Sequence, residues 1–326
     1  MNSSTSPHKS IEARLIETIR TMATHPGAHG LSDDAAHLGD LILSHDTIAE
    51  GVHYRADDPP DSVGWKLAAV NLSDLAGKGA EPVGALLSLT IGDPPDKMLP
   101  GEWEEAFLRG VAAAGESYGL PLMGGDTIAV PLGAPRVLGM TVIGRRGEAT
   151  PLRAGAQEGD AIVTVGTFGD AMAGLAQLEA DAGATGPLVD VYRRPIPQLA
   201  AGQALAPLAS AMMDVSDGLF LDADRMASAS GLGWEIELDA LPLSAAFLAQ
   251  RGEGRDARLF AASAGDDYAL LAAVPPRLVE TLSKSLPPGT MVQPVGRFVP
   301  GPARVLTHAG QRIELPERLG HEHRVE

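Results

Sequence analysis

Aspartates recur where this chain is expected to pass from a strand or loop into a helix, or to end a strand. They stand in the segments GLSDD, LSHDT, NLSD, MGGDT and MDVSDG, as Asp33, Asp34, Asp46, Asp74, Asp126, Asp214 and Asp217. Two carboxylates about 4 Å apart repel each other by about 4 kcal/mol at an effective dielectric constant of about 20. If the fold gathers five or more of them, the cluster must take up protons or recruit hard metal ions, and oxygen ligands in that number suit Mg²⁺. Crowded Mg²⁺ usually serves phosphate chemistry.

The NLSD segment also has a purely structural explanation. Asn71 and Asp74 are three residues apart and therefore share a helix face, and Lys78 is placed to form a solvated pair with Asp74. However, the neighbouring LAAV and LAG are too apolar for a simple solvent-facing surface. An aspartate in such surroundings needs a partner.

The other segments are open to similar alternatives. Gly-Gly-Asp is ordinary turn chemistry, and either Ser216 or Asp217 is a suitable helix cap. A single cap needs one such residue, whereas three polar groups crowd the four positions from Asp214 to Asp217. Free backbone N–H groups at a helix start also suit phosphate. Asp33 is best explained as a cap or as the neighbour of Asp34.

The composition excludes several classes of protein. The chain has 326 residues, 44% of them hydrophobic, which is enough for one large or two medium domains. A net charge of −17 argues against general binding to nucleic acids or to anionic membranes, because both need a basic surface. No apolar run approaches the length of a membrane span, the N-terminus has no secretory signal, and cysteine is absent. We therefore expect a cytoplasmic protein.

Apolar periodicity predicts strands alternating with helices. Helices are expected over residues 10–23, 61–79, 99–118, 197–209, 219–230 and 275–286, and strands over 41–47, 82–92, 136–145, 161–166, 233–238 and 268–274. The polar, glycine-rich segment 145–160 is the best domain boundary. The expected organisation is a disordered lead-in over residues 1–9, a first domain over 10–148 and a second over 149–326.

The order and spacing of the motifs resemble those of the thiamine-monophosphate kinase family. The motifs are GLSDDAA, SHDT with EGVHY, NLSDLAGKGAEP, MGGDT, GTFGDAMAGL, DVSDGL and AGDDYAL. That family belongs to the PurM-like superfamily of ATP-binding proteins, which includes aminoimidazole ribonucleotide synthetase. The resemblance implies an α/β (α+β) fold of two PurM-like domains: an N-terminal mixed sheet with helices on the ATP and dimer side, and a C-terminal α/β domain. It further implies a homodimer with ATP near the interface.

The resemblance also implies a set of ligands. Mg²⁺ is expected at Asp34, Ser44, Asp46, Asp74, Asp126, Asp214 and Asp217. ATP is expected to contact Gly125, Asp126, Arg153 and Ser216, and thiamine monophosphate to contact His53 and Asp266. No side chain is expected to act as a general base.

Three positions depart from the family pattern. His45 stands where the family usually has threonine, and Asp266 stands where it usually has glutamate. His321 stands near the end of the chain where the family tends to have an aromatic residue that packs on thiamine.

The implied reaction transfers the γ-phosphate of ATP to thiamine monophosphate. The acceptor phosphate has a second pKa of about 6 and is mostly ionised at neutral pH, so no base is required. Several Mg²⁺ ions can screen the repulsion between the two anions, which favours direct in-line transfer. The alternatives are another ATP-dependent synthetase of the superfamily, similar to aminoimidazole ribonucleotide synthetase, or a non-catalytic nucleotide sensor.

Overall fold

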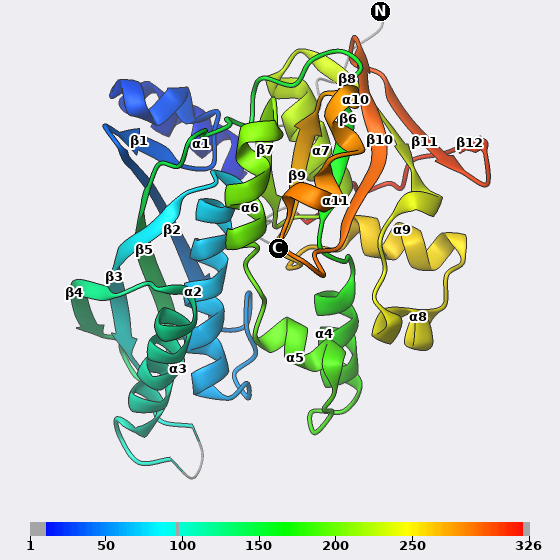
Figure 1. The fold of residues 1–326 in the computed structure, drawn as a ribbon. Coiled ribbons are helices and arrows are strands. Elements are labelled where there is room, and N and C mark those ends of the chain that lie inside the picture. The colour runs from blue at the N-terminus through cyan, green and yellow to red at the C-terminus, as the bar shows by residue number, and fades with distance from the viewer. Residues whose placement is uncertain (1–10, 96–97, 322–326) are drawn as a thin grey trace, which may run out of the picture.

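The computed structural model describes residues 11–95 and 98–321, with the N-terminal half on the left of Figure 1 and the C-terminal half on the right. The predicted lead-in over residues 1–9 lies outside the described residues. Each half is built on one β-sheet, and both sheets are mixed, with one parallel pair of strands in each.

The first sheet has the strand order β1-β2-β5-β3-β4, in which only β3 and β4 run parallel. Its strands are β1 (Ala36–Leu38), β2 (Leu41–Ala49), β3 (Glu81–Ile91), β4 (Leu122–Ala129) and β5 (Val137–Arg145). The second sheet has the order β12-β11-β8-β10-β6-β9-β7, in which only β8 and β11 run parallel. Its strands are β6 (Ala161–Val165), β7 (Ala211–Val215), β8 (Leu232–Glu237), β9 (Ala269–Val274), β10 (Val292–Pro300), β11 (Arg304–His308) and β12 (Gln311–Ile313).

The helices lie between and around these sheets (Figure 1). The α-helices are α1 (Ile11–Met22), α2 (Pro60–Gly77), α3 (Glu102–Tyr118), α4 (Asp170–Ala180), α5 (Pro187–Arg193), α6 (Leu199–Leu205), α7 (Leu219–Ala229), α8 (Ala245–Arg251), α9 (Arg255–Ser263), α10 (Pro276–Val279) and α11 (Leu282–Ser285). Short 3₁₀ turns are η1 (Pro26–Leu31), η2 (Ala206–Leu208) and η3 (Leu238–Ala240). Of the described helices, none is both long enough and apolar enough to cross a bilayer.

Helix α2 is the central element, because it packs against both halves. It contacts β2, β5 and α3 of the first half, and α6 and β7 of the second. Most of its residues are buried, as expected for a helix that is apolar nearly all round. Its last residue, Gly77, lies so close to β7 that a methyl group there would stand 2.8 Å from the backbone nitrogen of Asp214. The end of α2 and the end of β7 therefore meet with no space between their backbones.

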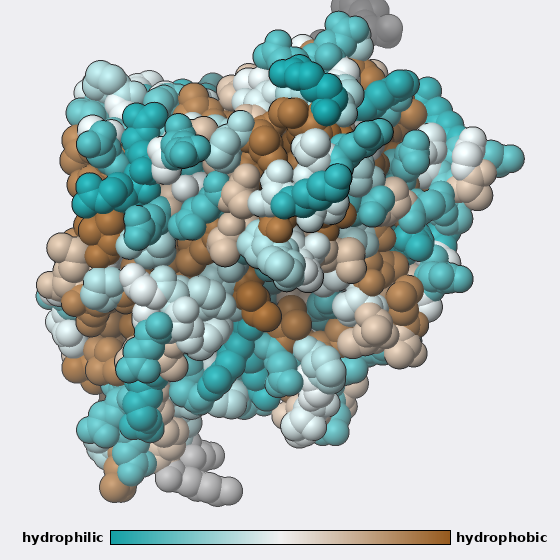
Figure 2. All heavy atoms as spheres, in the orientation of Figure 1, coloured by the Kyte–Doolittle hydropathy of each residue, from teal (hydrophilic) through white to brown (hydrophobic). Residues whose placement is uncertain are grey.

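The first sheet is covered on only one face. Helices α2 and α3 pack on it, whereas every residue of β4 is exposed. Apolar side chains on this uncovered region include Leu86, Leu122, Met123, Ile128 and Val137. Brown apolar atoms gather along the left border of Figure 2, over the region of β3 and β4 in Figure 1. A surface of this kind usually contacts another protein.

Two details differ from the predicted elements. The helix expected over residues 275–286 is interrupted at Glu280 and Thr281, which leaves the two short helices α10 and α11. Beyond the interruption, Leu282 and Leu286 are both buried in the core. Helices α5, α8 and α9 were not predicted, because each is nine residues or shorter and stands in a stretch with no long apolar repeat.

We expect Gly202→Ala to destabilise the protein through the contact between α6 and α2. A methyl group at this position would lie 2.1 Å from the carbonyl oxygen of Ala76. Overpacking costs about 1–3 kcal/mol, which outweighs a gain in helix propensity of at most about 1 kcal/mol. The measurement is the midpoint of urea unfolding, with Ala200→Ser on the exposed side of α6 as the control. An unchanged midpoint for Gly202→Ala would contradict this close contact.

Candidate active site

A cleft of about 1350 Å³ lies where the two halves meet. It is lined by β2, α2, the turns after β7 and after α9, and the end of the described chain. The predicted site residues that line it are Asp34, Ser44, Asp46, His53, Asp74, Arg153, Asp214, Ser216, Asp217 and Asp266. Residues from six separate segments of the sequence therefore meet in one cavity.

The NLSD segment ties α2 to β2. The side-chain oxygen of Asn71 accepts a hydrogen bond from the backbone N–H of Asp46 at 2.9 Å. One turn further along α2, Asp74 accepts a hydrogen bond from the hydroxyl of Ser44. Asn71 thus fixes the strand, while Ser44, Asp46 and Asp74 all line the cleft. The solvated-helix explanation of this segment is wrong.

Asp33 and Asp34 form a buried ion-pair network. The Lys78 ammonium lies 2.6 Å from Asp33 Oδ1 and 3.0 Å from Asp34 Oδ2, and its side chain is fully buried. Arg153 adds a guanidinium contact to Asp34 and a backbone N–H bond of 2.8 Å to Asp33 Oδ1. Asp33 is therefore not a helix cap. Lys78 pairs with these two residues of the first half and not with Asp74, and its ammonium also donates a hydrogen bond to the Met212 carbonyl of the second half at 3.1 Å.

The turn after β7 presents Asp214, Ser216 and Asp217 to the cleft. Gly218, which follows them, has φ +113°, a conformation that favours glycine, and a methyl group there would meet the carbonyl of Ala264 at 2.8 Å. The Ser216 carbonyl accepts a hydrogen bond from the backbone N–H of Asp266 at 2.8 Å. The two turns are thus packed against each other, which brings the two motifs into one site.

Two residues that sequence reasoning missed support this turn. Arg225 on α7 lies 2.5 Å from Asp217 Oδ2 and 2.7 Å from Asp222 Oδ1. The Asp222 carboxylate also accepts a hydrogen bond from the backbone N–H of Asp217 at 3.1 Å. Burial raises the pKa of Asp222 to about 6, even though Arg225 opposes this. The spacing of Asp217, Asp222 and Arg225 along one helix start was the available signal.

The crowded carboxylates strongly perturb one another. Burial, together with the negative charges of Asp34 and Asp46, raises the pKa of Asp214 to about 8. Burial and the neighbouring Asp46 and Asp214 raise the pKa of Asp74 well above its ordinary value. Asp34 goes the other way: burial would raise its pKa, but Lys78 and Arg153 outweigh that effect and lower it. The cleft thus holds more carboxylates than its own cations can neutralise.

These carboxylates fit Mg²⁺ by their chemistry, since hard oxygen donors are its preferred ligands. Among the described residues, no group of three or more His, Asp or Glu side chains is already arranged around one point as an ion site. Asp34 and Asp217 are instead bonded to Arg153 and Arg225. The surplus charge at Asp74 and Asp214 remains for a cation or a proton to neutralise.

The lining of the cleft also includes apolar and aromatic residues. They include Met172, Leu175, Tyr192 and Phe260. The two predicted substrate-binding residues line the cleft as well. The ring Nδ1 of His53 accepts a hydrogen bond from the backbone N–H of Ala49 at 3.0 Å. Asp266 is paired with Lys66 at 2.5 Å, and sequence reasoning overlooked this lysine, a lone charge in an apolar helical stretch.

Gly125 and Asp126 are the exceptions among the predicted site residues. Both lie on β4, exposed, and neither lines the cleft. Asp126 stands opposite Ser88 in the parallel pairing of β3 and β4, with β5 and β3 between it and Asp46 on β2. Gly125 is required by packing, since a methyl group there would lie 2.0 Å from the Leu87 carbonyl oxygen. Within one chain, the structure does not bring these two residues to the other predicted ligands.

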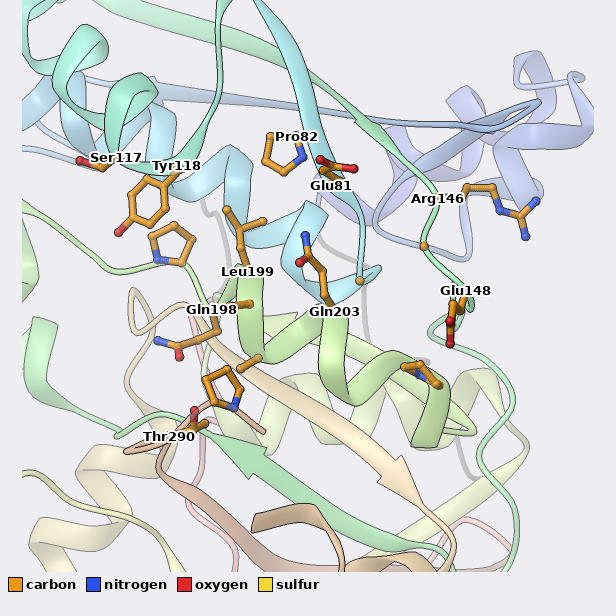
Figure 3. Close-up of a pocket in the computed structure, with 17 residues that line it drawn as sticks. Glu81, Pro82, Ser117, Tyr118, Arg146, Glu148, Gln198, Leu199, Gln203 and Thr290 are labelled. Carbon is orange, nitrogen blue, oxygen red and sulfur yellow. The ribbon is translucent and has the colours of Figure 1, made fainter. Parts of the chain in front are cut away.

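A second cavity of about 710 Å³ lies on another side of the junction between the halves. Figure 3 shows Tyr118 from α3, Gln198, Leu199 and Gln203 around α6, and Thr290 around it. None of the predicted site residues lines this cavity. The chemistry-bearing residues therefore belong to the larger cleft.

Comparisons with known proteins identify the family of this chain. The chain matches the family models "AIR synthase related protein, N-terminal domain" over residues 32–146 and "AIR synthase related protein, C-terminal domain" over residues 157–308. The thiamine-monophosphate kinase of Caulobacter vibrioides is 38% identical over 307 residues, which cover 90% of this chain and 85% of that protein.

Solved structures show the same relationship. AaThiL complexed with AMPPCP and TMP has a TM-score of 0.79 and 29% identity, and the match covers 95% of this chain and 97% of that one. The thiamine-monophosphate kinase of Stenotrophomonas maltophilia has a TM-score of 0.71 and 32% identity, with 92% and 96% covered. This chain therefore belongs to the thiamine-monophosphate kinase family of the AIR synthase related, PurM-like proteins.

Proposed function

We propose that this protein is a thiamine-monophosphate kinase that transfers the γ-phosphate of ATP to thiamine monophosphate, giving thiamine diphosphate and ADP. The observation that carries the proposal is the lining of the cleft, which combines buried carboxylates such as Asp74 and Asp214 with apolar and aromatic residues. The relatives named above carry the same activity in their names. Because ATP is the donor, we infer that the enzyme works in the cytoplasm.

The transfer requires positioning more than proton chemistry. A bond forms between a phosphate oxygen of thiamine monophosphate and the γ-phosphorus, and the bond from that phosphorus to the β,γ-bridging oxygen breaks, so that ADP leaves. The acceptor oxygen is already ionised at neutral pH, and no base is needed. All four of Arg153, Ser216, His53 and Asp266 line the cleft. We assign the first two to contacts with ATP and the last two to contacts with thiamine monophosphate.

The residues that we assign to Mg²⁺ are held in place by contacts within the chain. Asp34, Ser44, Asp46, Asp74, Asp214 and Asp217 would hold Mg²⁺ within the cleft. When bound, Mg²⁺ neutralises charge between the two phosphates and so permits direct in-line transfer. Without the ion, Lys78 and Arg153 hold Asp34 in place. Hydrogen bonds from Ser44 to Asp74 and from the backbone of Asp46 to Asn71 hold β2 against α2.

We further propose that the protein acts as a homodimer in which each cleft receives Asp126 from the partner. The unpaired strand edges of the first sheet include β4 and the part of β2 beyond Leu43, where pairing with β1 stops. An exposed edge strand is a ready surface for pairing with another chain. If β4 of one copy approaches β2 of the other, two-fold symmetry forms the same contact twice and brings Asp126 near Asp46. The exposed apolar residues of β3 and β4 are then covered.

The activity itself is tested by incubating the protein with ATP, Mg²⁺ and thiamine monophosphate and measuring thiamine diphosphate. We expect product, and we expect Asp214→Asn to lower turnover at least about 100-fold, because it removes charge from the site that screens the two phosphates. Asp224→Asn is the control for loss of a carboxylate: Asp224 lies on α7, the helix that follows β7, and pairs with Arg304 outside the cleft. Wild-type turnover in Asp214→Asn would show that Asp214 has only a structural role.

The same assay of the wild-type protein separates the alternative functions. Absence of thiamine diphosphate, with turnover of another phosphorylated substrate, would assign the chain to a different synthetase. ATP binding without any turnover would favour a sensor.

Mg²⁺ should bind the nucleotide-free protein more tightly as the pH rises from about 6 to about 8, and no more tightly above that. The pKa of Asp214 is raised to about 8, so below that pH the ion must displace a proton from a group that is largely protonated. The raised pKa also means that the metal-free protein loses stability as the pH rises through about 8. Calorimetric titration at several pH values measures the binding, and Asp214→Asn should flatten the pH dependence. An affinity that does not change with pH in the wild type would contradict this coupling.

Mixing inactive subunits tests the shared site. Asp126→Asn and Asp214→Asn should each be inactive as homodimers, but a mixed dimer contains one cleft in which both residues are intact. Co-expression in equal amounts should therefore restore about a quarter of wild-type turnover, since about half of the dimers are mixed and each has one working site. If each chain used its own Asp126, every cleft would carry a lesion, and no activity would return.

A further inference from the structure

Lys66 is a buried cation that the proposed reaction does not yet use. It lies on α2 with only 2% of its side chain exposed, and its ammonium stands 2.5 Å from Asp266 Oδ2. The same ammonium lies 4.2 Å from the centre of the Tyr192 ring. A buried ammonium is strongly unfavourable unless it is paired, so Asp266 and Tyr192 together account for its position.

The partners of Lys66 face the cleft, whereas Lys66 does not. Asp266, Tyr192 and Tyr268 all line the cavity, and Lys66 is absent from its wall. The Asp266 side chain retains 19% exposure. Lys66 therefore holds one oxygen of Asp266 from behind while the carboxylate remains open toward the cleft.

The second oxygen of Asp266 is held as well. Tyr268 donates a hydrogen bond from its hydroxyl to Asp266 Oδ1 at 2.9 Å. Asp266 and Tyr268 have φ values of +70° and +51°, which L-residues rarely adopt. Backbone N–H bonds to the Ser216 and Val215 carbonyls, at 2.8 and 3.0 Å, fix both residues in this conformation. The position of the Asp266 carboxylate is thus fixed by contacts to both of its oxygens and by the hydrogen bond of the Asp266 backbone.

A purely structural ion pair between the halves is the competing explanation. Lys66 belongs to the first half, and Asp266, Tyr192 and Tyr268 belong to the second. Replacing a buried ion pair by apolar residues is often neutral or stabilising, so packing alone gives little reason for charges here. A charged pair is needed if one member must keep its charge and its orientation at the wall of a binding site.

We propose that Lys66 is a positioning residue for thiamine monophosphate: with Tyr268, it orients the Asp266 carboxylate to receive the nitrogen heterocycles of that substrate. The inference rests on the proposed function. Thiamine carries a cationic ring and an amino-substituted pyrimidine, and a fixed carboxylate suits both a positive charge and an amino donor. Lys66 acts only through Asp266 and does not contact ATP.

The first test compares the binding of the two substrates. Lys66→Met keeps the length of the side chain and removes its charge. It should weaken binding of thiamine monophosphate at least about tenfold while changing ATP binding less than about twofold, because only the substrate side loses its oriented acceptor. Lys66→Arg should recover most of the loss. Equal weakening of both substrates, or no change in either, would overturn the proposal.

A double-mutant cycle separates positioning from direct contact. Asp266→Asn alone should weaken thiamine monophosphate binding, and adding Lys66→Met should then have little further effect, because Lys66 has no carboxylate left to orient. Additive losses would show that Lys66 acts on the substrate independently of Asp266, which contradicts the proposal. The double variant leaves no charge unpaired, and so it serves if Lys66→Met alone does not fold. Tyr268→Phe is a further check, since it removes the other hydrogen bond to Asp266 and should also weaken only thiamine monophosphate binding.

Arg136→Met is the matched control for loss of a buried cation. Arg136 is equally buried, lies 3.2 Å from Glu104, and stacks 4.2 Å from the centre of the Trp103 ring, but it does not line the cleft. It should lower the melting temperature without changing the ratio of the two substrate affinities. A ratio shifted as much as in Lys66→Met would mean that general destabilisation explains both. The outcomes also remain distinct from failure of the proposed function, in which the wild type itself forms no thiamine diphosphate.

Discussion

The structure depends on a buried helix that carries polar side chains. Helix α2 is enclosed by both halves of the protein, yet it carries Lys66, Asn71 and Asp74 and is followed directly by the buried Lys78. A buried polar group without a partner costs about 1–3 kcal/mol, and more if it is charged. Each of the four must therefore find its partner on an element that packs against the helix. The partners come from the loop before β1, from β2 and from the turn before β9, so satisfying α2 also assembles the cleft.

The cleft takes its chemistry from the same arrangement. Lys78 and Arg153 neutralise Asp33 and Asp34 on one side, and Arg225 neutralises Asp217 and Asp222 on the other. Among the residues that the structure describes, none forms a salt bridge with Asp74 or Asp214, and burial and their negative neighbours raise the pKa values of both. The carboxylates of the cleft require added cations, and bound cations attract phosphate groups. A protein with a net charge of −17 can therefore bind phosphate groups at this cleft.

The sequence was sufficient for the family, the mixed two-sheet fold and most of the cleft, and the comparisons confirm the first two. The order of the motifs carried this information. Their expected position at the ends of regular elements was wrong for Asp46, Asp74 and Asp126, which lie within β2, α2 and β4. Ion pairs between residues that are far apart in the chain could not be predicted from the sequence. Lys78 looked like the partner of Asp74, four residues away, but its true partners precede it by more than forty residues. The spacing of residues along α2 does not predict which other segment each of its faces contacts. The pairing of Lys66 with Asp266, and that of Asp33 with Lys78, were therefore not predicted.

Asp126 shows a different limit, since neither the local sequence nor the fold of one chain gives it a partner. Its strand pairs on one side only and is exposed along its whole length, while the cleft that holds the other predicted ligands borders the unpaired part of β2. An edge strand that stays uncovered is a liability for a protein, and apolar residues along it make the liability greater. In the homodimer that we propose, a second copy would cover this edge and bring Asp126 to the partner's cleft. The same reasoning explains why a glycine precedes Asp126: only without a side chain can β4 lie close enough to β3 for that edge to form.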